Sequence, residues 1–264
     1  MPRQDHLLPT SPAHVWSRQF WVAVAIAAVC ALAWLLTEPL AQDPLYHNFA
    51  DQRSMLGVPH ALNVLSNAAF CLAGIWGCVL VARCSTAVAG LKLIYRAFFL
   101  GVFFTGFGSA YYHLSPDNTT LVWDRLPMTI GFMAFTSLVV AERYSESLGR
   151  RLFPWLLIAG FLSVVFWGWQ DDLRPYFLVQ FGPMLILPVI IWRCSGPGTR
   201  WLWLMVACYF AAKVLELSDA QLLTYTEGLV SGHTLKHLAA AIGTAMIVVK
   251  VQVAGKQPAE SVRR

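Results

Sequence analysis

The sequence GSAYYH at residues 108–113 ends a long apolar segment, and the sequence DRLP at residues 124–127 opens the next one. Ser109 and His113 lie four positions apart, so on a helix their side chains face the same way. Far along the chain, SGHTLKH at residues 231–237 opens the last apolar segment with a second pair at this spacing, His233 and His237. The fold is therefore expected to bring these segments together.

The composition indicates a membrane protein. The chain has 264 residues, of which 57% are hydrophobic and 12% are charged, whereas soluble domains carry about 25% charged residues. The apolar residues form runs near the ~20 residues that a helix needs to cross a bilayer. Such runs are too long for barrel strands, and only helices or closed barrels satisfy the backbone in lipid. We therefore predict an all-α, polytopic transmembrane helical bundle.

The apolar runs predict an N-terminal span followed by seven more. The first covers about residues 20–36, and the alternative for this run is a signal peptide cut near Ala41. The polar segment at residues 1–19 precedes the bundle, which forms a single domain at residues 20–252 and is followed by a polar tail at residues 253–264. The other seven spans are expected at residues 60–82, 94–113, 123–141, 152–169, 175–192, 201–217 and 230–251.

The distribution of basic residues predicts the orientation. On this span assignment, 14 Lys and Arg residues fall on the side of the two termini and three fall in the opposite loops. Basic residues concentrate in cytoplasmic loops, so both termini are expected in the cytoplasm. The net charge of +5 has the same origin, and it gives no reason to expect a nucleic-acid partner.

This orientation places the polar residues of the opening motifs in one layer. The span at residues 94–113 runs outward and ends at His113, and Asp124 starts the next span from the outer side. The last span enters from outside, so His233 and His237 lie in its first two turns. Residues distant in the sequence are thus expected to meet near the extracytoplasmic face.

Three imidazoles suit Zn²⁺, because catalytic zinc sites use three protein ligands and leave one position open. We therefore take His113, His233 and His237 as metal ligands. Asp124 is a candidate for accepting a proton from the attacking water, and Ser109 for stabilising an oxyanion. The alternative is that histidines at helix ends only form interhelical hydrogen bonds, but ionisable groups near lipid are costly and usually functional.

Other polar residues in the spans have a structural interpretation. Asn63, Ser66 and Asn67 share one helix face and are expected to form hydrogen bonds between helices. Lys213 and Glu216 lie three positions apart and are expected to form an ion pair that joins helices.

The order and spacing of Ser109, His113, Asp124, His233 and His237 resemble those of the alkaline ceramidase family. This family belongs to a superfamily of seven-span membrane hydrolases that includes the adiponectin-receptor-like proteins. The sequence NVLSN at residues 63–67 is similar to the family's Asn-x-x-Ser-Asn motif. The resemblance covers about residues 45–250, all but the first span and the tail.

The resemblance implies that the three histidines bind zinc, assisted by Ser109 and Asp124. It also implies hydrolysis of the amide bond of ceramides to a sphingoid base and a fatty acid, with a membrane lipid as the partner. Two features differ from animal members, which have an acidic calcium-binding segment. This chain has an extra N-terminal span, and its region from Asp51 to His60 has few carboxylates, which argues against calcium. The extra span and the sequence FADQR at residues 49–53 resemble bacterial members and thus imply a bacterial inner membrane.

Two alternatives to a ceramidase remain open at this point. One is a lipid-sensing receptor or scaffold in which the zinc is structural, and the other is a hydrolase of another lipid amide or ester. A transporter is least favoured, because no broken-helix pair or internal repeat is evident. The sequence identifies no protein partner.

Overall fold

A computed structural model of the chain describes residues 36–84 and 88–256. The predicted span at residues 20–36 lies almost wholly outside the described residues, as does most of the polar tail. The chain divides after Leu40 into two compact units, and all elements named below belong to the second, which begins at Ala41.

The described part of the chain is helical and contains no β-strand, as the all-α prediction requires. Each predicted span from residue 60 onward coincides with a helix, and the short helices η1, η2 and α9 are additional. The elements are η1 (Pro44–His47), α2 (Ala61–Ser66), α3 (Ala68–Arg83), η2 (Ala89–Leu91), α4 (Lys92–Leu114), α5 (Asn118–Arg143), α6 (Glu146–Gln170), α7 (Arg174–Arg193), α8 (Thr199–Leu217), α9 (Asp219–Tyr225) and α10 (Gly232–Lys256).

Several helices are long and apolar enough to cross a membrane. Five stretches of the described residues satisfy both conditions: α2 with α3, η2 with α4, α6, α7 and α10. The α8–α9 pair would be a sixth, although it is bent by 79°. Helix α5 is not among them and carries charged residues near both ends. The structure thus supports five or six spans by length and composition, and the seven-span core stays a prediction.

The bend between α8 and α9 differs from the expectation that no helix pair is broken. Helix α8 ends at Leu217, and α9 starts at Asp219 in a new direction. At the join, the Ser218 N–H donates to the carbonyl oxygens of Val214 and Leu215, which closes the last turn of α8. The bend carries the chain across toward the start of α10.

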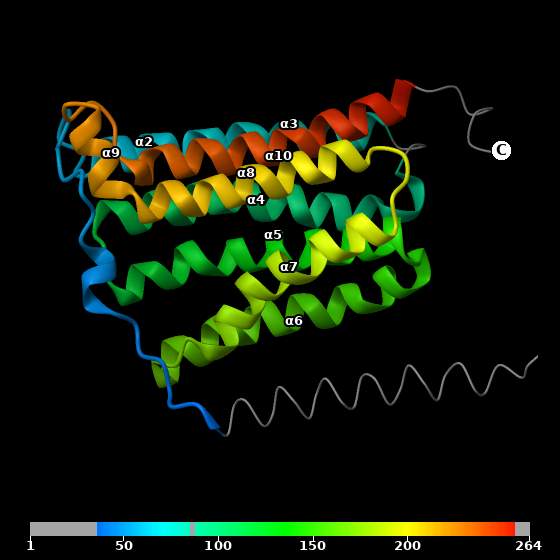
Figure 1. The fold of residues 1–264 in the computed structure, drawn as a ribbon, viewed down its shortest axis with the longest axis horizontal. Helices are drawn as coiled ribbons and strands as arrows, with labels where there is room; N and C mark the ends of the chain where they lie inside the picture. Colours follow the sequence, from blue (N-terminus) through cyan, green and yellow to red (C-terminus); the bar gives the residue numbers. More distant parts are fainter. Residues whose placement is uncertain (1–35, 85–87, 257–264) are drawn as a thin grey trace, which may run out of the picture. The chain divides into compact units, whose positions relative to one another are not determined.

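The long helices pack side by side, and successive ones run in opposite directions (Figure 1). Helix α4 lies between α3 and α5, and α10 packs against α8 and α3. Helices α3, α5, α7 and α10 therefore end at the same side of the bundle, and each ends on a basic residue: Arg83, Arg143, Arg193 and Lys256. The opposite side holds the site described below.

Two glycines allow the close helix contacts that form this site. At Gly108 on α4, an added Cβ would lie 2.0 Å from the carbonyl oxygen of Trp123 on α5. Pro127 cannot donate the helical hydrogen bond to that carbonyl, so α4 packs directly on it. At Gly232, an added Cβ would lie 2.1 Å from the carbonyl oxygen of Leu215 on α8. Small residues of this kind let helix backbones approach closely.

Candidate metal centre

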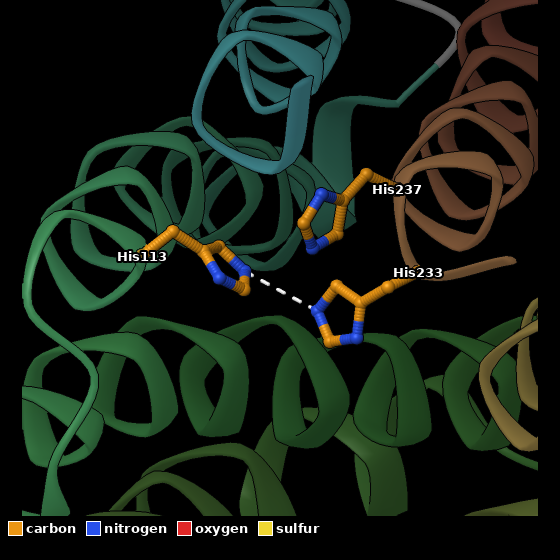
Figure 2. A group of neighbouring side chains, drawn as sticks. All are labelled: His113, His233 and His237. Atoms are coloured by element: carbon orange, nitrogen blue, oxygen red, sulfur yellow. Dashed lines mark hydrogen bonds between the residues drawn. The ribbon is translucent and has the colours of Figure 1, made fainter. Parts of the chain in front are cut away.

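His113, His233 and His237 meet at one end of the bundle (Figure 2). His113 lies in the last turn of α4, and the other two lie in the first two turns of α10. One ring nitrogen from each histidine lies within 4.8 Å of the other two. All three side chains are buried, with at most 5% of any residue exposed. The predicted convergence of the three histidines is therefore confirmed.

The spacing of the ring nitrogens fits a shared metal ion. A tetrahedral zinc with Zn–N distances near 2.0–2.1 Å holds two ligand nitrogens about 3.3–3.4 Å apart. The Nε2 atoms of His113 and His233 are 3.3 Å apart, the contact drawn as a dashed line in Figure 2. Two Nε2 atoms that face each other at this distance are arranged as two ligands of one ion would be. The three histidines could therefore bind a metal ion.

The orientation of His237 is set by a hydrogen bond from α2. Its Nδ1 lies 2.8 Å from the Ser66 hydroxyl, which lies 3.0 Å from the Asn63 carbonyl oxygen. Because that hydroxyl has one proton and donates it to Asn63, it accepts from Nδ1–H and leaves Nε2 free for a metal. Thr234 on α10 also donates to the Asn63 side chain at 2.7 Å. The predicted interhelical hydrogen bonds are confirmed for Asn63 and Ser66, and the one from Ser66 orients a candidate ligand. The Asn67 side chain instead donates to the Asn63 carbonyl oxygen four residues before it.

A matched substitution tests this role of Ser66. Ser66→Ala removes the acceptor of His237 Nδ1–H, and we expect zinc affinity to fall by about 10–100-fold, as for other partners of metal-binding histidines. Titration with a competing chelator would measure it. Ser163→Ala is the control, because the Ser163 hydroxyl donates to the Gly160 carbonyl on α6, away from the histidines. Unchanged affinity in Ser66→Ala would remove Ser66 from the site.

Asp219 fixes the start of α10, a role that sequence reasoning missed. One carboxylate oxygen accepts from the His233 backbone N–H at 2.7 Å, and the other accepts from the Ala50 N–H at 3.0 Å. The bend before α9 brings Asp219 to this position. In the sequence, Asp219 lies one helical turn beyond Glu216, and this spacing favours an ion pair rather than a helix cap.

Phe49 covers two of the histidines. Its ring centroid lies 4.6 Å from that of His113 and 4.4 Å from that of His233. The following residues hold this loop down, because Arg53 pairs with Asp51 at 2.6 Å and also donates to the Leu229 carbonyl at 3.1 Å. The hydrogen bonds from Arg53 hold the pKa of the Asp51 carboxyl below its usual value. The sequence pattern assigns Phe49 no role at the site.

Ser109 and Asp124 line a polar cavity of about 80 Å³ beside this cluster, together with His237. The Ser109 side chain lies close to the Asp124 carboxyl group. The structure thus brings both predicted catalytic residues to the histidine that Ser66 orients. His113 and His233 do not line this cavity, and His237 is the member of the histidine cluster that does. The catalytic roles themselves stay predictions.

The same cavity contains an ion-pair network between α8 and α10. Glu216 pairs with Lys213 on its own helix, and its other carboxylate oxygen lies 2.5 Å from Lys236 Nζ. The predicted ion pair is confirmed, and Lys236 is the helix-joining partner that the sequence did not reveal. All three residues line the cavity with Asp124.

A larger apolar cavity of about 430 Å³ adjoins the polar one. It lies between α4, α5, α7, α8 and α10, with side chains such as Phe98, Phe135 and Leu187 in its wall. The two cavities are adjacent, because six residues line both of them: Phe70, Thr105, Met128, Gln180, Tyr209 and Ala240. The site is therefore a polar cavity beside an apolar one.

Comparison with protein-family models, with curated proteins and with solved structures finds no match for this chain. The resemblance to alkaline ceramidases thus depends on the residue pattern described above.

Proposed function

We propose that this chain is a zinc-dependent integral-membrane amidase of the alkaline ceramidase type, with a seven-span core and one extra N-terminal helix. Its substrate would be a ceramide-like membrane lipid, and its products a sphingoid base and a fatty acid. The observation that carries the proposal is the adjacency of the two cavities. The polar one places Ser109, Asp124 and His237 together, and the apolar one offers about 430 Å³ for lipid chains.

His113, His233 and His237 would hold the zinc. When bound, zinc activates water and polarises a carbonyl group. Asp124 would accept a proton during attack and pass it to the leaving nitrogen, because it lies in the cavity wall beside His237. Ser109 would donate a hydrogen bond to the oxygen of the scissile carbonyl as charge develops there.

The number of candidate ligands favours an enzyme over a receptor or scaffold. Structural zinc sites are usually closed by four protein ligands, whereas catalytic sites keep one position open. Within the described ranges, the metal-ligating group has three members. A polar cavity with a carboxylate beside that group is expected of a hydrolase, and a purely structural site has no need for it.

The orientation of the bundle supplies a second part of the proposal. We place both termini in the cytoplasm and the metal site near the extracytoplasmic face, so that a lipid amide at the headgroup boundary meets the site. The basic helix ends at the far side of the bundle support this orientation. We expect a C-terminal fusion to be active with a reporter that works only in the cytoplasm, and inactive with a reporter that works only outside it. Activity restricted to the extracytoplasmic side would contradict the orientation.

One experiment tests the function directly. The protein would be purified in detergent, its metal content measured by elemental analysis, and turnover of a fluorescent ceramide followed on the same preparation. We expect about one zinc per chain and release of labelled fatty acid that a chelator abolishes. A preparation that holds zinc and lipid but cleaves no lipid amide or ester would favour the receptor or scaffold. Cleavage of an ester or of another amide alone would replace the substrate.

A further inference from the structure

Arg125 is a buried cation without a carboxylate partner among the described residues. It follows Asp124 on α5, is 4% exposed, and lines the polar cavity. One of its terminal nitrogens, Nη2, donates to the Gln42 side chain at 2.6 Å. The other, Nη1, is buried and has no hydrogen-bond acceptor in the described ranges. An unmade hydrogen bond to a buried charged group is costly, so this donor calls for an explanation.

Three other cations that are buried or partly buried in the described bundle have close anionic partners. Lys213 and Lys236 share Glu216, and Lys250 lies 2.5 Å from Glu142 at the far end of the bundle. Arg125 instead lies against aromatic rings, with its Cζ atom 4.1 Å from the centroid of Trp167 and 4.6 Å from that of Tyr176. Rings attract a cation but do not neutralise it. The contrast indicates that an acceptor for Arg125 is supplied from outside the bundle.

The charges around the polar cavity have the same implication. Its wall contains three basic residues, Arg125, Lys213 and Lys236, against the carboxylates of Asp124 and Glu216. One positive charge is therefore uncompensated in the group, and Arg125 is the basic residue that has no ion-pair partner in the described ranges, since both lysines contact Glu216. A divalent metal at the histidines would increase this surplus. A cavity of this kind favours a negatively charged occupant.

The position of Arg125 shows which part of a lipid would carry that charge. Tyr46 and Arg125 line the polar cavity but not the apolar one, so they lie away from the chain-binding space. Tyr46 belongs to the loop that begins at Ala41. This loop covers Arg125, because Gln42 and Tyr46 both contact the guanidinium group. A lipid with its chains in the apolar cavity and its amide beside Asp124 would direct its headgroup toward Arg125.

We propose that Arg125 forms an oxyanion-binding subsite, and that among ceramide-like lipids the protein prefers an N-acyl lipid with a carboxylate, sulfonate or phosphate near its amide. The inference rests on the proposed lipid amidase and specifies its substrate class. Arg125 determines specificity here by pairing with the headgroup. Guanidinium groups suit this role, since they present paired N–H donors to planar or tetrahedral oxyanions.

Two lipids with the same acyl chain test the proposal by binding alone. N-oleoyltaurine carries a sulfonate where N-oleoylethanolamine carries a hydroxyl. Both would be titrated calorimetrically into the full-length protein after metal removal, so that no turnover interferes. We expect the wild type to bind the sulfonate at least about tenfold tighter, in line with the strength of hydrogen bonds to charged groups. Arg125→Gln should bring the ratio close to one without changing the affinity for the alcohol.

Two further variants separate a binding role from a structural one. Arg125→Lys keeps the charge and should retain part of the preference. Arg193→Gln is the matched control, because Arg193 also lies over an aromatic ring, that of Trp192, but is exposed at the end of α7. It should keep the full preference. If Arg125→Gln does not fold, a preference that is unchanged in Arg125→Lys would overturn the proposal, since a point charge cannot replace the paired donors.

The remaining outcomes are also distinct. Equal binding of the two lipids by the wild type, or an unchanged ratio in Arg125→Gln, would overturn the proposal. So would a dependence on Arg125 that is found for free oleate but not for N-oleoyltaurine, because the subsite would then serve the released carboxylate. A protein that prefers the sulfonate through Arg125 but hydrolyses no lipid would support the subsite and refute the amidase.

Discussion

Replacing any one of His113, His233 and His237 with Ala is expected to lower bound zinc and abolish turnover. Each change removes a nitrogen from a group whose members lie within 4.8 Å of one another. The loss of zinc affinity should exceed the roughly 10–100-fold effect of removing a partner that only orients a ligand. Elemental analysis and ceramide turnover on the same preparations would measure both effects.

His47→Ala provides the control for these variants. His47 lies in η1 at the same end of the bundle and pairs with Tyr112 at 2.9 Å, outside the histidine cluster. It should keep zinc and activity, which separates loss of a ligand from general damage to this end of the protein. Full zinc occupancy in all three alanine variants of the cluster would rule out the assigned ligands.

Asp124→Asn is expected to keep its zinc and lose most of its turnover. The amide preserves the size of the side chain but cannot accept a proton at catalytic rates. General acid–base groups contribute about 10²–10⁴-fold, so a deficit of on the order of 10² or more is expected. Ser109→Ala should lose about 10²–10³-fold if its hydroxyl stabilises the oxyanion, again with zinc retained. Steady-state rates would be compared at equal zinc content.

Asp117→Asn is the matched control on the same helix. Asp117 caps the N-terminus of α5, where its carboxylate accepts from the Thr120 backbone N–H at 2.7 Å. Asparagine caps helices about as well as aspartate, so this variant should fold and turn over normally. If Asp124→Asn or Ser109→Ala matches its rate, the catalytic role assigned to that residue is wrong.

Much of this architecture could be predicted because lipid restricts the choices. Apolar runs must form helices in a bilayer, so both ends of α4, α7 and α8 fall within a few residues of the predicted bounds. Helix α6 starts earlier than predicted, because a polar turn extends it at its N-terminus. The convergence of His113 with His233 follows from alternating helix direction. Neither inference required knowledge of side-chain packing.

What escaped prediction depends on contacts that leave no periodic pattern. The covering position of Phe49 is determined by a loop, and the cap formed by Asp219 depends on the 79° bend of α8–α9. The burial of Arg125 arises from rings contributed by three separate elements. The close approach at Gly108 depends on the Trp123 carbonyl, to which Pro127 cannot donate a hydrogen bond. This contact can be recognised only once α4 and α5 are packed together.

The loop around Phe49 has a consequence for the kinetics of metal exchange. Its ring lies against His113 and His233. Two hydrogen bonds hold the residues that follow: the Ala50 N–H donates to Asp219, and the Arg53 side chain donates to the Leu229 carbonyl oxygen. An ion bound at the histidines could leave toward this side only when these contacts open together. The residence time of the metal would then be set by the lifetime of the closed loop, so a tightly retained ion need not be a strongly bound one.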